Sequence, residues 1–418
     1  MKKLLSLGLV LVVSYTDASI VEMSGSLTSF CEDVKIEMPG SGSYTYQSPS
    51  SAEIGSFTQI INLIQTGKYA EAGTRAKGLG YDLIHFVDGN SAFYILAEGT
   101  TTTGTWTPSP QKGWGTYIFY PEANQDIILE VPHPRFDMDT WRIGIEAYRK
   151  LFSSWFLMAG THRYANGTYS DMAHIASSIF EAVHETVSTT TSHIIQPHGF
   201  SITNHPGYPD CVLSRGAIPV SSVIYDLSAN LNAEGFTTGI YDGATYTDLA
   251  ATTNIQGQYT NAIASSFIHM EETLDVRQNQ YQKVVTAMDK TFQPRVEIKK
   301  TVIVYDYTDT APQTGQASKG DTLRYTIIGT NTGYAAAKGV VIIDVLPLAT
   351  EYRAGHTYGP SGWTIYYSSD GGVSYTTTEF ADFTPQAGTN LKIQFRQDEE
   401  IKLKEKETAA FELRMRVR

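Results

Sequence analysis

The sequence changes character at Pro294, and this change constrains the fold more than any other feature. Before Pro294, short apolar runs alternate with segments of helical spacing, which predicts an α/β fold with a mixed sheet and helices on both faces. After it, β-branched runs of alternating polarity are separated by turns of glycine, asparagine and serine, which is typical of an all-β sandwich. Proline breaks a helix, so we predict an α/β domain over residues 51–293 and a β-sandwich domain over residues 294–418.

Charge and histidine content divide at the same point. Residues 294–418 carry fifteen basic and fifteen acidic side chains, so the whole net charge of −12 belongs to the residues before them. Seven of the ten histidines fall between His133 and His205, and only His356 follows Pro294. An acidic chain argues against a nucleic acid as partner, because phosphate backbones attract basic surfaces. We therefore expect the chemistry in the histidine-rich first part.

The N-terminus has the pattern of a secretory signal peptide. A basic start precedes an apolar run over residues 4–13 that is too short to span a bilayer, and small residues near Ala18 offer a cleavage site. We predict a signal peptide over residues 1–19. No second long apolar segment follows, so the mature chain is expected to lack a transmembrane segment and to be secreted, periplasmic or at the cell surface.

Residues 20–50 are rich in serine, glycine and tyrosine, and we predict a flexible lead-in there. The chain has two cysteines, Cys31 and Cys211. In an oxidising compartment they could pair and tie the lead-in to the body of the protein, or they could remain two free thiols.

Polar residues follow four predicted strands, at the place where open α/β sheets carry their sites. His133 and Asp137 come after the strand at 127–131, and His198 comes after the strand at 193–195. Histidines and a carboxylate on rigid loops suit a divalent metal such as zinc. Two alternatives stay open: His133 and Asp137 could cap the strand and the next helix, and His198 could be a hydrogen-bonded turn residue.

The other two strand ends carry a cation and an acid. His162 and Arg163 follow the strand at 155–159, where an arginine can grip a substrate carboxylate through two parallel hydrogen bonds, or form a surface ion pair. Glu271 ends the last strand of this part and could act as general base toward a metal-activated water. A carboxylate that merely stabilises a helix N-terminus is the alternative there, as is common at the position of Glu272.

The order of these motifs over roughly residues 80–290 resembles zinc metallocarboxypeptidases and N-formylglutamate-amidohydrolase-like proteins. Those families have an α/β fold in which histidines and an acid hold zinc. The resemblance implies zinc ligands at His133, Asp137 and His198. It also implies that Glu271 is the base and that Arg163, with His162 beside it, grips a substrate carboxylate.

Two positions depart from the metallocarboxypeptidase pattern. The acid follows His133 at a spacing of His-x-x-x-Asp in place of His-x-x-Glu, so Glu130 and Asp171 remain alternatives for the second ligand. A His-Arg pair stands where those peptidases have Asn-Arg. The resemblance therefore implies a distant relative that acts on amides.

The C-terminal part has a resemblance of its own. Lys319–Ile327, Asn331–Gly333 and Asp344–Pro347 match the pattern GDT-x-x-Y-x-I, NTG and D-x-LP of the Ig-like repeat of bacterial surface proteins. The match covers essentially all of residues 295–418. Such repeats are usually spacers or attachment units, which implies cell-surface attachment through this domain.

Together these features predict a secreted zinc-dependent hydrolase of amide or peptide bonds, acting on a small molecule or peptide that carries a carboxylate. The sequence contains no GxSxG, P-loop, GxGxxG or HExxH motif that would indicate other chemistry. A non-catalytic surface or adhesion protein with a hydrolase-like fold is the alternative, and metal content would separate the two. A third hypothesis is a carbohydrate-active enzyme, whose glycan hydrolysis would survive chelation.

Overall fold

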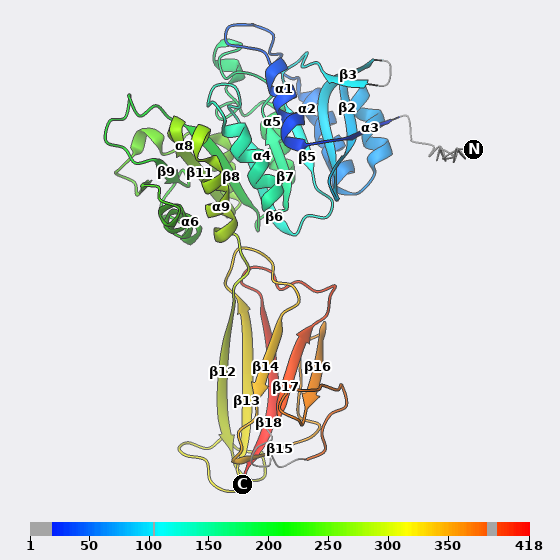
Figure 1. Ribbon diagram of the computed structural model, residues 1–418, viewed down its shortest axis with the longest axis vertical. Coiled ribbons are helices and arrows are strands. Elements are labelled where there is room, and N and C mark those ends of the chain that lie inside the picture. The colour runs from blue at the N-terminus through cyan, green and yellow to red at the C-terminus, as the bar shows by residue number, and fades with distance from the viewer. Residues whose placement is uncertain (1–18, 103–104, 383–390) are drawn as a thin grey trace, which may run out of the picture. The chain divides into compact units, whose positions relative to one another are not determined.

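The computed structural model describes residues 19–102, 105–382 and 391–418 (Figure 1). The chain divides into two compact units with a boundary between Lys290 and Thr291, four residues before Pro294. Residues 1–18 of the predicted signal peptide lie outside the described residues. In the described part, no helix is both long enough and apolar enough to cross a membrane.

Eleven strands among the described residues of the first unit form one mixed sheet. They are β1 (Ile20–Ser24), β2 (Tyr81–Asp88), β3 (Ser91–Thr102), β4 (Thr105–Pro108), β5 (Thr116–Phe119), β6 (Gln125–Val131), β7 (Ser153–Met158), β8 (His193–Gly199), β9 (Cys211–Ser214), β10 (Thr238–Ile240) and β11 (Ser266–Glu272). Their order is β1-β2-β3-β5-β7-β6-β8-β11-β9-β10, with β4 paired to β3.

The four strands that the sequence marks as site-bearing are neighbours in this sheet. β7, β6, β8 and β11 lie side by side, and each adjacent pair among them is parallel. Parallel strands bring their carboxyl ends to one edge of the sheet. The residues that follow these strands therefore meet, as the sequence predicts.

Helices connect the strands and pack on the sheet. Their bounds are α1 (Leu27–Glu37), α2 (Ser51–Gln65), α3 (Tyr69–Lys77), α4 (Thr140–Lys150), α5 (Ile179–Val187), α6 (Ser222–Ala233), α7 (Ile255–Ala262), α8 (Leu274–Asn279) and α9 (Tyr281–Thr291). A 3₁₀ turn (Gly167–Ser170) and a loop precede the short α5.

Two contacts of β6 show that helices cover both faces of the sheet. Glu130 of β6 contacts His184 of α5. Val131, the residue after Glu130, faces α4 so closely that a Cβ added at Gly144 of that helix would lie 2.6 Å from its side chain. Consecutive strand residues point to opposite faces, so α4 and α5 lie on opposite sides of β6. The predicted two-sided α/β sheet is confirmed in this respect, and the glycine lets α4 approach the strand closely.

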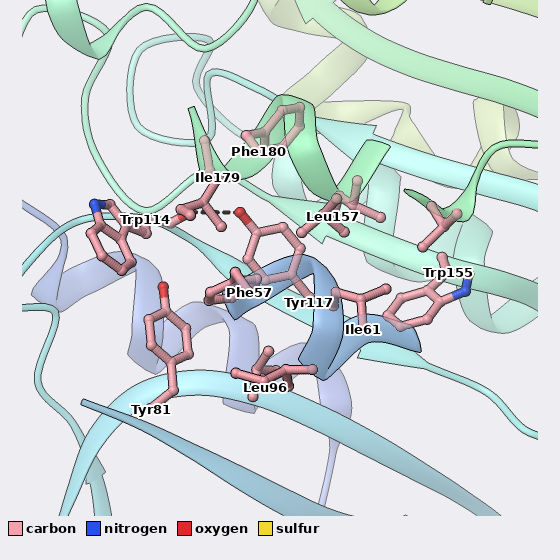
Figure 2. Packing of buried hydrophobic residues seen from close by; sticks show 14 of the residues in the cluster. Phe57, Ile61, Tyr81, Leu96, Trp114, Tyr117, Trp155, Leu157, Ile179 and Phe180 are labelled. Carbon is pink, nitrogen blue, oxygen red and sulfur yellow. Dashed lines mark hydrogen bonds between the residues drawn. The ribbon is translucent and has the colours of Figure 1, made fainter. Parts of the chain in front are cut away.

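A large apolar cluster fixes α5 behind the site-bearing strands. Its buried members come from α2, α3, α5, the strands of the sheet and the loops that join them, and all are nearly inaccessible to solvent. Figure 2 shows the packing of Phe57, Ile61, Tyr117, Leu157, Ile179 and Phe180. Burying one such side chain stabilises a fold by about 1.5–3 kcal/mol, so this cluster holds the sheet and α5 in a fixed relation.

The structure corrects the prediction of a flexible lead-in over residues 20–50. Ile20–Ser24 pair in parallel with residues 83–87, and Ser26 caps α1, which buries Leu27 and Phe30. The sequence pattern misses this strand because its pairing partner lies sixty residues away. Both cysteines are buried and free, so the alternative of two free thiols describes this structure.

The second unit consists of antiparallel strands. They are β12 (Val296–Tyr305), β13 (Thr322–Asn331), β14 (Val341–Val345), β15 (Thr350–Tyr352), β16 (Trp363–Ser368), β17 (Lys392–Gln397) and β18 (Thr408–Val417). One sheet has the order β12-β13-β18-β15 and the other β14-β17-β16. The rings of Phe395 and Phe411, one from each sheet, lie 4.3 Å apart in a shared core. The two-sheet architecture agrees with the sequence, and the Ig-like assignment stays a prediction.

Candidate metal centre

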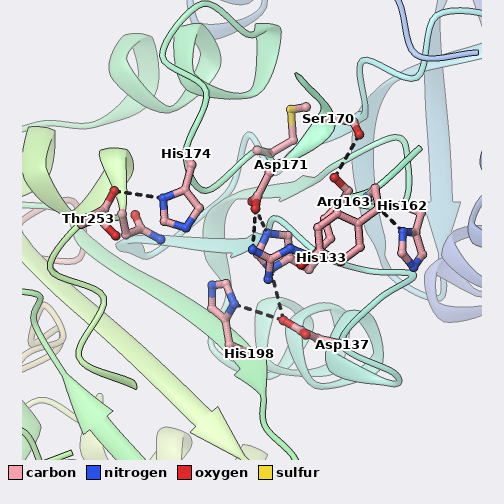
Figure 3. A network of polar contacts seen from close by, with 12 residues as sticks. His133, Asp137, His162, Arg163, Ser170, Asp171, His174, His198 and Thr253 are labelled. Carbon is pink, nitrogen blue, oxygen red and sulfur yellow. Dashed lines mark hydrogen bonds and ion pairs between the residues drawn. The ribbon is translucent and has the colours of Figure 1, made fainter. Parts of the chain in front are cut away.

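Three of the predicted ligands converge at the carboxyl ends of β6 and β8. Asp137 Oδ2 lies 3.2 Å from His133 Nδ1 and 3.1 Å from His198 Nδ1. One ligand atom from each residue falls within 4.8 Å of the others, and all three side chains are buried. Figure 3 shows them facing one another. Two imidazoles and a carboxylate in this arrangement suit a borderline divalent metal such as zinc.

A tight turn after β6 brings Asp137 to His133. The Asp137 amide donates to the His133 carbonyl over 2.9 Å, and Asp139 then takes a left-handed backbone with φ 67° before α4 begins. Asp139, not Asp137, is the N-cap residue of α4, and its side chain makes no capping hydrogen bond. The alternative in which Asp137 caps the next helix therefore does not apply.

Each histidine of the group has an acceptor behind it. His133 Nε2 lies 2.8 Å from Asp171 Oδ1, and His198 Nε2 lies 3.1 Å from the side-chain oxygen of Gln196. An acceptor at Nε2 favours the tautomer with its proton there, which leaves a lone pair on Nδ1. Both Nδ1 atoms point toward Asp137, so the donor set fits a metal at this place.

The pKa values of the group bear on that role. Burial raises the pKa of Asp137, but the neighbouring imidazoles of His133 and His198 outweigh burial and hold this pKa below its ordinary value. Burial also raises the pKa of Asp171, but the hydrogen bond with His133 and the charges of His133 and Arg163 outweigh burial and lower this pKa to about 2. Burial holds the pKa of His198 below its ordinary value. At neutral pH, both carboxylates are ionised and His198 is neutral. Burial lowers the pKa of His133, but its contacts with Asp137 and Asp171 outweigh burial and raise this pKa above its ordinary value, so a metal must displace a proton from this imidazole.

Glu271 lies beside this group on β11. It forms a second set with His198 and His269, whose ligand atoms also fall within 4.8 Å of one another. Glu271 Oε1 is 3.6 Å from His269 Nε2, and its Oε2 is buried without a hydrogen-bond partner among the described residues. Burial, and then the charge of Asp137, raise the pKa of Glu271 well above its ordinary value. His269, two residues before Glu271 on β11, is a site residue to which the sequence analysis gives no role.

Arg163 and His162, which follow β7, point in different directions. Arg163 lines the cavity described below, where its guanidinium forms a short ion pair with Asp171 and lies 5.2 Å from the ring of Phe136. His162 does not line that cavity, and its Nδ1 instead accepts a hydrogen bond from the Tyr164 amide. Figure 3 shows His162 apart from the metal-binding group. The predicted substrate contact by His162 finds no support in this lining and stays a prediction.

Arg277 is a second cavity-lining cation, and the sequence analysis misses it. Its Nε and Nη1 donate to the carbonyls of Glu272 and Met138 over 3.2 and 2.5 Å, and the residue is 5% exposed. Within the described part of the chain its Nη2 has no hydrogen-bond partner and its charge no ion pair. Gly199 makes room for it, since a Cβ there would lie 2.2 Å from the guanidinium carbon.

Glu130, one of the two alternative ligands, lies behind the centre. One of its carboxylate oxygens is 2.6 Å from His184 Nδ1, and the other accepts from the side-chain amide of Gln196 over 2.8 Å. Glu130 and His184 are fully buried. Both oxygens are thus engaged away from the ligand group. The other alternative, Asp171, supports His133 from the side opposite Asp137.

An open cavity of about 1010 Å³ lies over the carboxyl ends of β6, β8 and β11. Its wall includes the ligand group, Glu271 and both arginines, and also His174, whose Nδ1 lies 3.1 Å from the Thr253 carbonyl. Four partly exposed apolar side chains add to the lining: Phe136, Met138, Ile202 and Leu274. The cavity therefore offers metal ligands, a carboxyl, cations and apolar surface to one bound molecule.

No protein-family model matches the chain, and no curated protein matches its sequence. Solved structures that resemble it include a bacteriophage poly-gamma-glutamate hydrolase, at 9% identity and a TM-score of 0.31, covering 40% of this chain and 83% of that one. A gene product of Agrobacterium tumefaciens has 10% identity and a TM-score of 0.30, covering 40% and 87%.

A candidate metallopeptidase from Shewanella denitrificans has 9% identity and a TM-score of 0.27, and covers 55% of this chain and 87% of its own. Likenesses at such low TM-scores carry no argument about what this chain binds or converts.

Proposed function

We propose that the first unit is a zinc-dependent hydrolase of amide or peptide bonds. The observation that carries this proposal is the convergence of His133, Asp137, His198 and Glu271 in one cavity. The Nδ1 atoms of the two histidines and the Asp137 carboxylate would hold the metal. A divalent metal bound there supplies Lewis-acid chemistry, which polarises a carbonyl and makes water more acidic.

Glu271 is the residue we assign to proton transfer. Burial raises the pKa of its carboxyl and so favours the protonated form in the metal-free protein, whereas a divalent cation nearby favours the carboxylate, because an opposite charge lowers a pKa. As a carboxylate it takes a proton from the attacking water. It then delivers that proton to the departing amine nitrogen, so that the amide bond breaks without leaving an unstable anion.

The cations of the cavity support a substrate that carries a carboxylate. Arg163 is already paired with Asp171, which limits the hydrogen bonds it can offer. Arg277 keeps Nη2 free, and its other nitrogens are held by backbone carbonyls. We infer that Arg277 contacts the carboxylate directly, with Arg163 contributing charge from the other wall.

The second unit has no comparable cavity group among the described residues, and we propose that it is an attachment or spacer module of Ig-like type. A secreted, periplasmic or cell-surface location is proposed on residues 1–19 of the sequence. An extracellular hydrolase held at a surface by such a module is consistent with both.

The purified full chain tests the proposal. We expect one zinc per molecule and hydrolysis of N-acyl amino acids or short peptides with a free carboxylate, with slower hydrolysis of their amidated forms. Chelation removes the activity and zinc restores it. Glu271→Gln is expected to lower kcat by about 10²–10⁴-fold while keeping zinc. Glu272→Gln is the matched control, because Glu272 is the neighbouring buried carboxyl and does not line the cavity.

The outcomes separate the competing hypotheses. A protein that binds no zinc, or that hydrolyses amides equally well after chelation, contradicts the proposal. Bound zinc without hydrolysis of any amide favours the non-catalytic surface protein. Glycan hydrolysis that survives chelation favours the carbohydrate-active enzyme.

A further inference from the structure

Gln196 lies between the metal-binding group and a buried ion pair. Its side-chain oxygen faces His198 Nε2 at 3.1 Å and also accepts from the Asn254 amide over 2.8 Å. Its side-chain nitrogen donates to Glu130 over 2.8 Å and to Gln256 over 3.2 Å. Gln196 is fully buried, so these bonds account for its polar atoms without solvent.

The orientation of this amide is set from behind. Glu130 is an acceptor when ionised, and its second oxygen lies 2.6 Å from His184 Nδ1, with both side chains fully buried. A carboxylate in that place cannot face the Gln196 oxygen, because two acceptors would then meet without a proton. The Gln196 nitrogen must point to Glu130, and the oxygen must point to His198.

The oxygen in turn selects the tautomer of His198. Only a protonated Nε2 can donate to it, which leaves the lone pair of the neutral imidazole on Nδ1. This atom faces the Asp137 carboxylate at 3.1 Å with no proton between them, and a metal ion held by both would compensate for that. We propose that Gln196, oriented by the Glu130–His184 pair, is a positioning residue that holds His198 as an Nδ1 metal ligand. This inference rests on the metal site of the proposed function.

The arrangement makes the two histidine ligands unequal. His133 has an ionised carboxylate, Asp171, at its Nε2, whereas His198 has a neutral amide there. An anionic acceptor makes an imidazole a stronger electron donor than a neutral one does. The amide thus fixes the orientation of His198 without adding a further negative charge next to Asp137.

Zinc affinity of the full-length protein tests this role, measured by competition with a chelator at constant pH. Gln196→Leu removes the acceptor and is expected to weaken zinc binding by about 10–100-fold. Gln196→Glu is the rescue variant: beside Glu130 its carboxyl takes a proton, donates it to Glu130 and keeps a carbonyl oxygen toward His198. Its zinc affinity is expected to stay within about threefold of the wild type, on the same scale.

Gln256→Leu is the matched control for a structural effect. Gln256 belongs to the same buried network, donates to Glu181 over 2.6 Å and has no contact with His198. We expect it to lower the Tm of the metal-free protein about as much as Gln196→Leu does, but to keep the zinc affinity. The absorption spectrum of the Co²⁺-loaded protein should change for Gln196→Leu alone.

The results distinguish the two levels of the argument. Wild-type protein that binds no zinc overturns the proposed function, and this inference with it. Zinc binding by the wild type with unchanged affinity in Gln196→Leu overturns only the role of Gln196. Equal losses in Gln196→Leu and Gln196→Glu, or in Gln196→Leu and Gln256→Leu, also overturn it. If Gln196→Leu does not fold, the comparison of Gln196→Glu with the wild type decides.

Discussion

The two units of this chain bury different kinds of side chain. The first unit buries carboxylates and imidazoles at adjacent strand ends, among them Glu130, His133 and Asp137. The core shared by the two sheets of the second unit is apolar. Beside it, the ion pair Lys300–Asp344 links β12 to β14, and its lysine side chain is 32% exposed. Burying an ionisable group is costly unless it is paired. A concentration of such groups in one unit therefore marks the place where function outweighs stability.

The largest expected effect comes from substitutions that remove the converging metal ligands of the first unit. His133→Ala and His198→Ala each delete one of the three converging ligands. Zinc content is expected to fall from one per molecule to near zero after dialysis, and hydrolysis to fall with it. His205→Ala is the control, because His205 pairs with Asp248 at the cavity wall and takes no part in either ligand group. Full zinc content in both ligand variants would exclude this centre.

The next effect belongs to the second unit alone. Phe411 is fully buried, and its ring packs at a tilt of 35° against that of Phe395 across the two sheets. Phe411→Ala should destabilise this unit by about 3–5 kcal/mol through lost packing and the cavity left behind. Chemical denaturation should reveal the loss, while zinc content and activity stay at wild-type values. Val373→Ala, at a residue 87% exposed, serves as control. A loss of zinc in Phe411→Ala would show that the two units are not independent in function.

Sequence patterns recover the part of this comparison that depends on local order. Apolar strands followed at once by polar residues reveal His133, His198 and Glu271, since strand ends in such sheets meet at one edge. The change in sequence pattern at Pro294 predicts a domain boundary that lies within four residues of the boundary between the two compact units. These features depend only on the order of neighbouring residues, so they can be found without knowledge of the packing.

The remainder depends on contacts between distant segments. Asp171 stands 38 residues from His133, and Gln196 stands 66 from Glu130, so neither pairing leaves a periodic signal. Arg277 belongs to the helix after β11, where a cation is commonly a solvated residue. The supporting residues of a site are thus harder to predict than its ligands.

A pH effect on stability is expected in the first unit. Burial raises the pKa of Glu181 to about 7, against 4.5 without burial. Because the folded state holds the proton more tightly, stability falls as the pH rises from about 4.5 to 7. Glu181→Gln removes that loss. The free energy of unfolding of this variant should equal that of the wild type at pH 4.5 and exceed it at pH 8 by about 1–3 kcal/mol. The upper limit is set by 1.36 kcal/mol per pKa unit. Unfolding at both pH values measures this, and an equal difference at each would contradict it.

The smallest effect concerns an ion pair of the second unit. Lys300 Nζ lies 2.6 and 2.8 Å from the two oxygens of Asp344, and the lysine side chain is 32% exposed. Solvent screens such a pair, so Lys300→Met should cost about 1 kcal/mol or less, and less still at high salt. The buried Glu130–His184 pair of the first unit is the contrast, because losing one partner there leaves an uncompensated charge at a cost of about 3–5 kcal/mol. Denaturation of Lys300→Met and His184→Leu at low and high salt compares the two directly. Equal costs that salt does not change would mean that the units do not differ in how they hold charge.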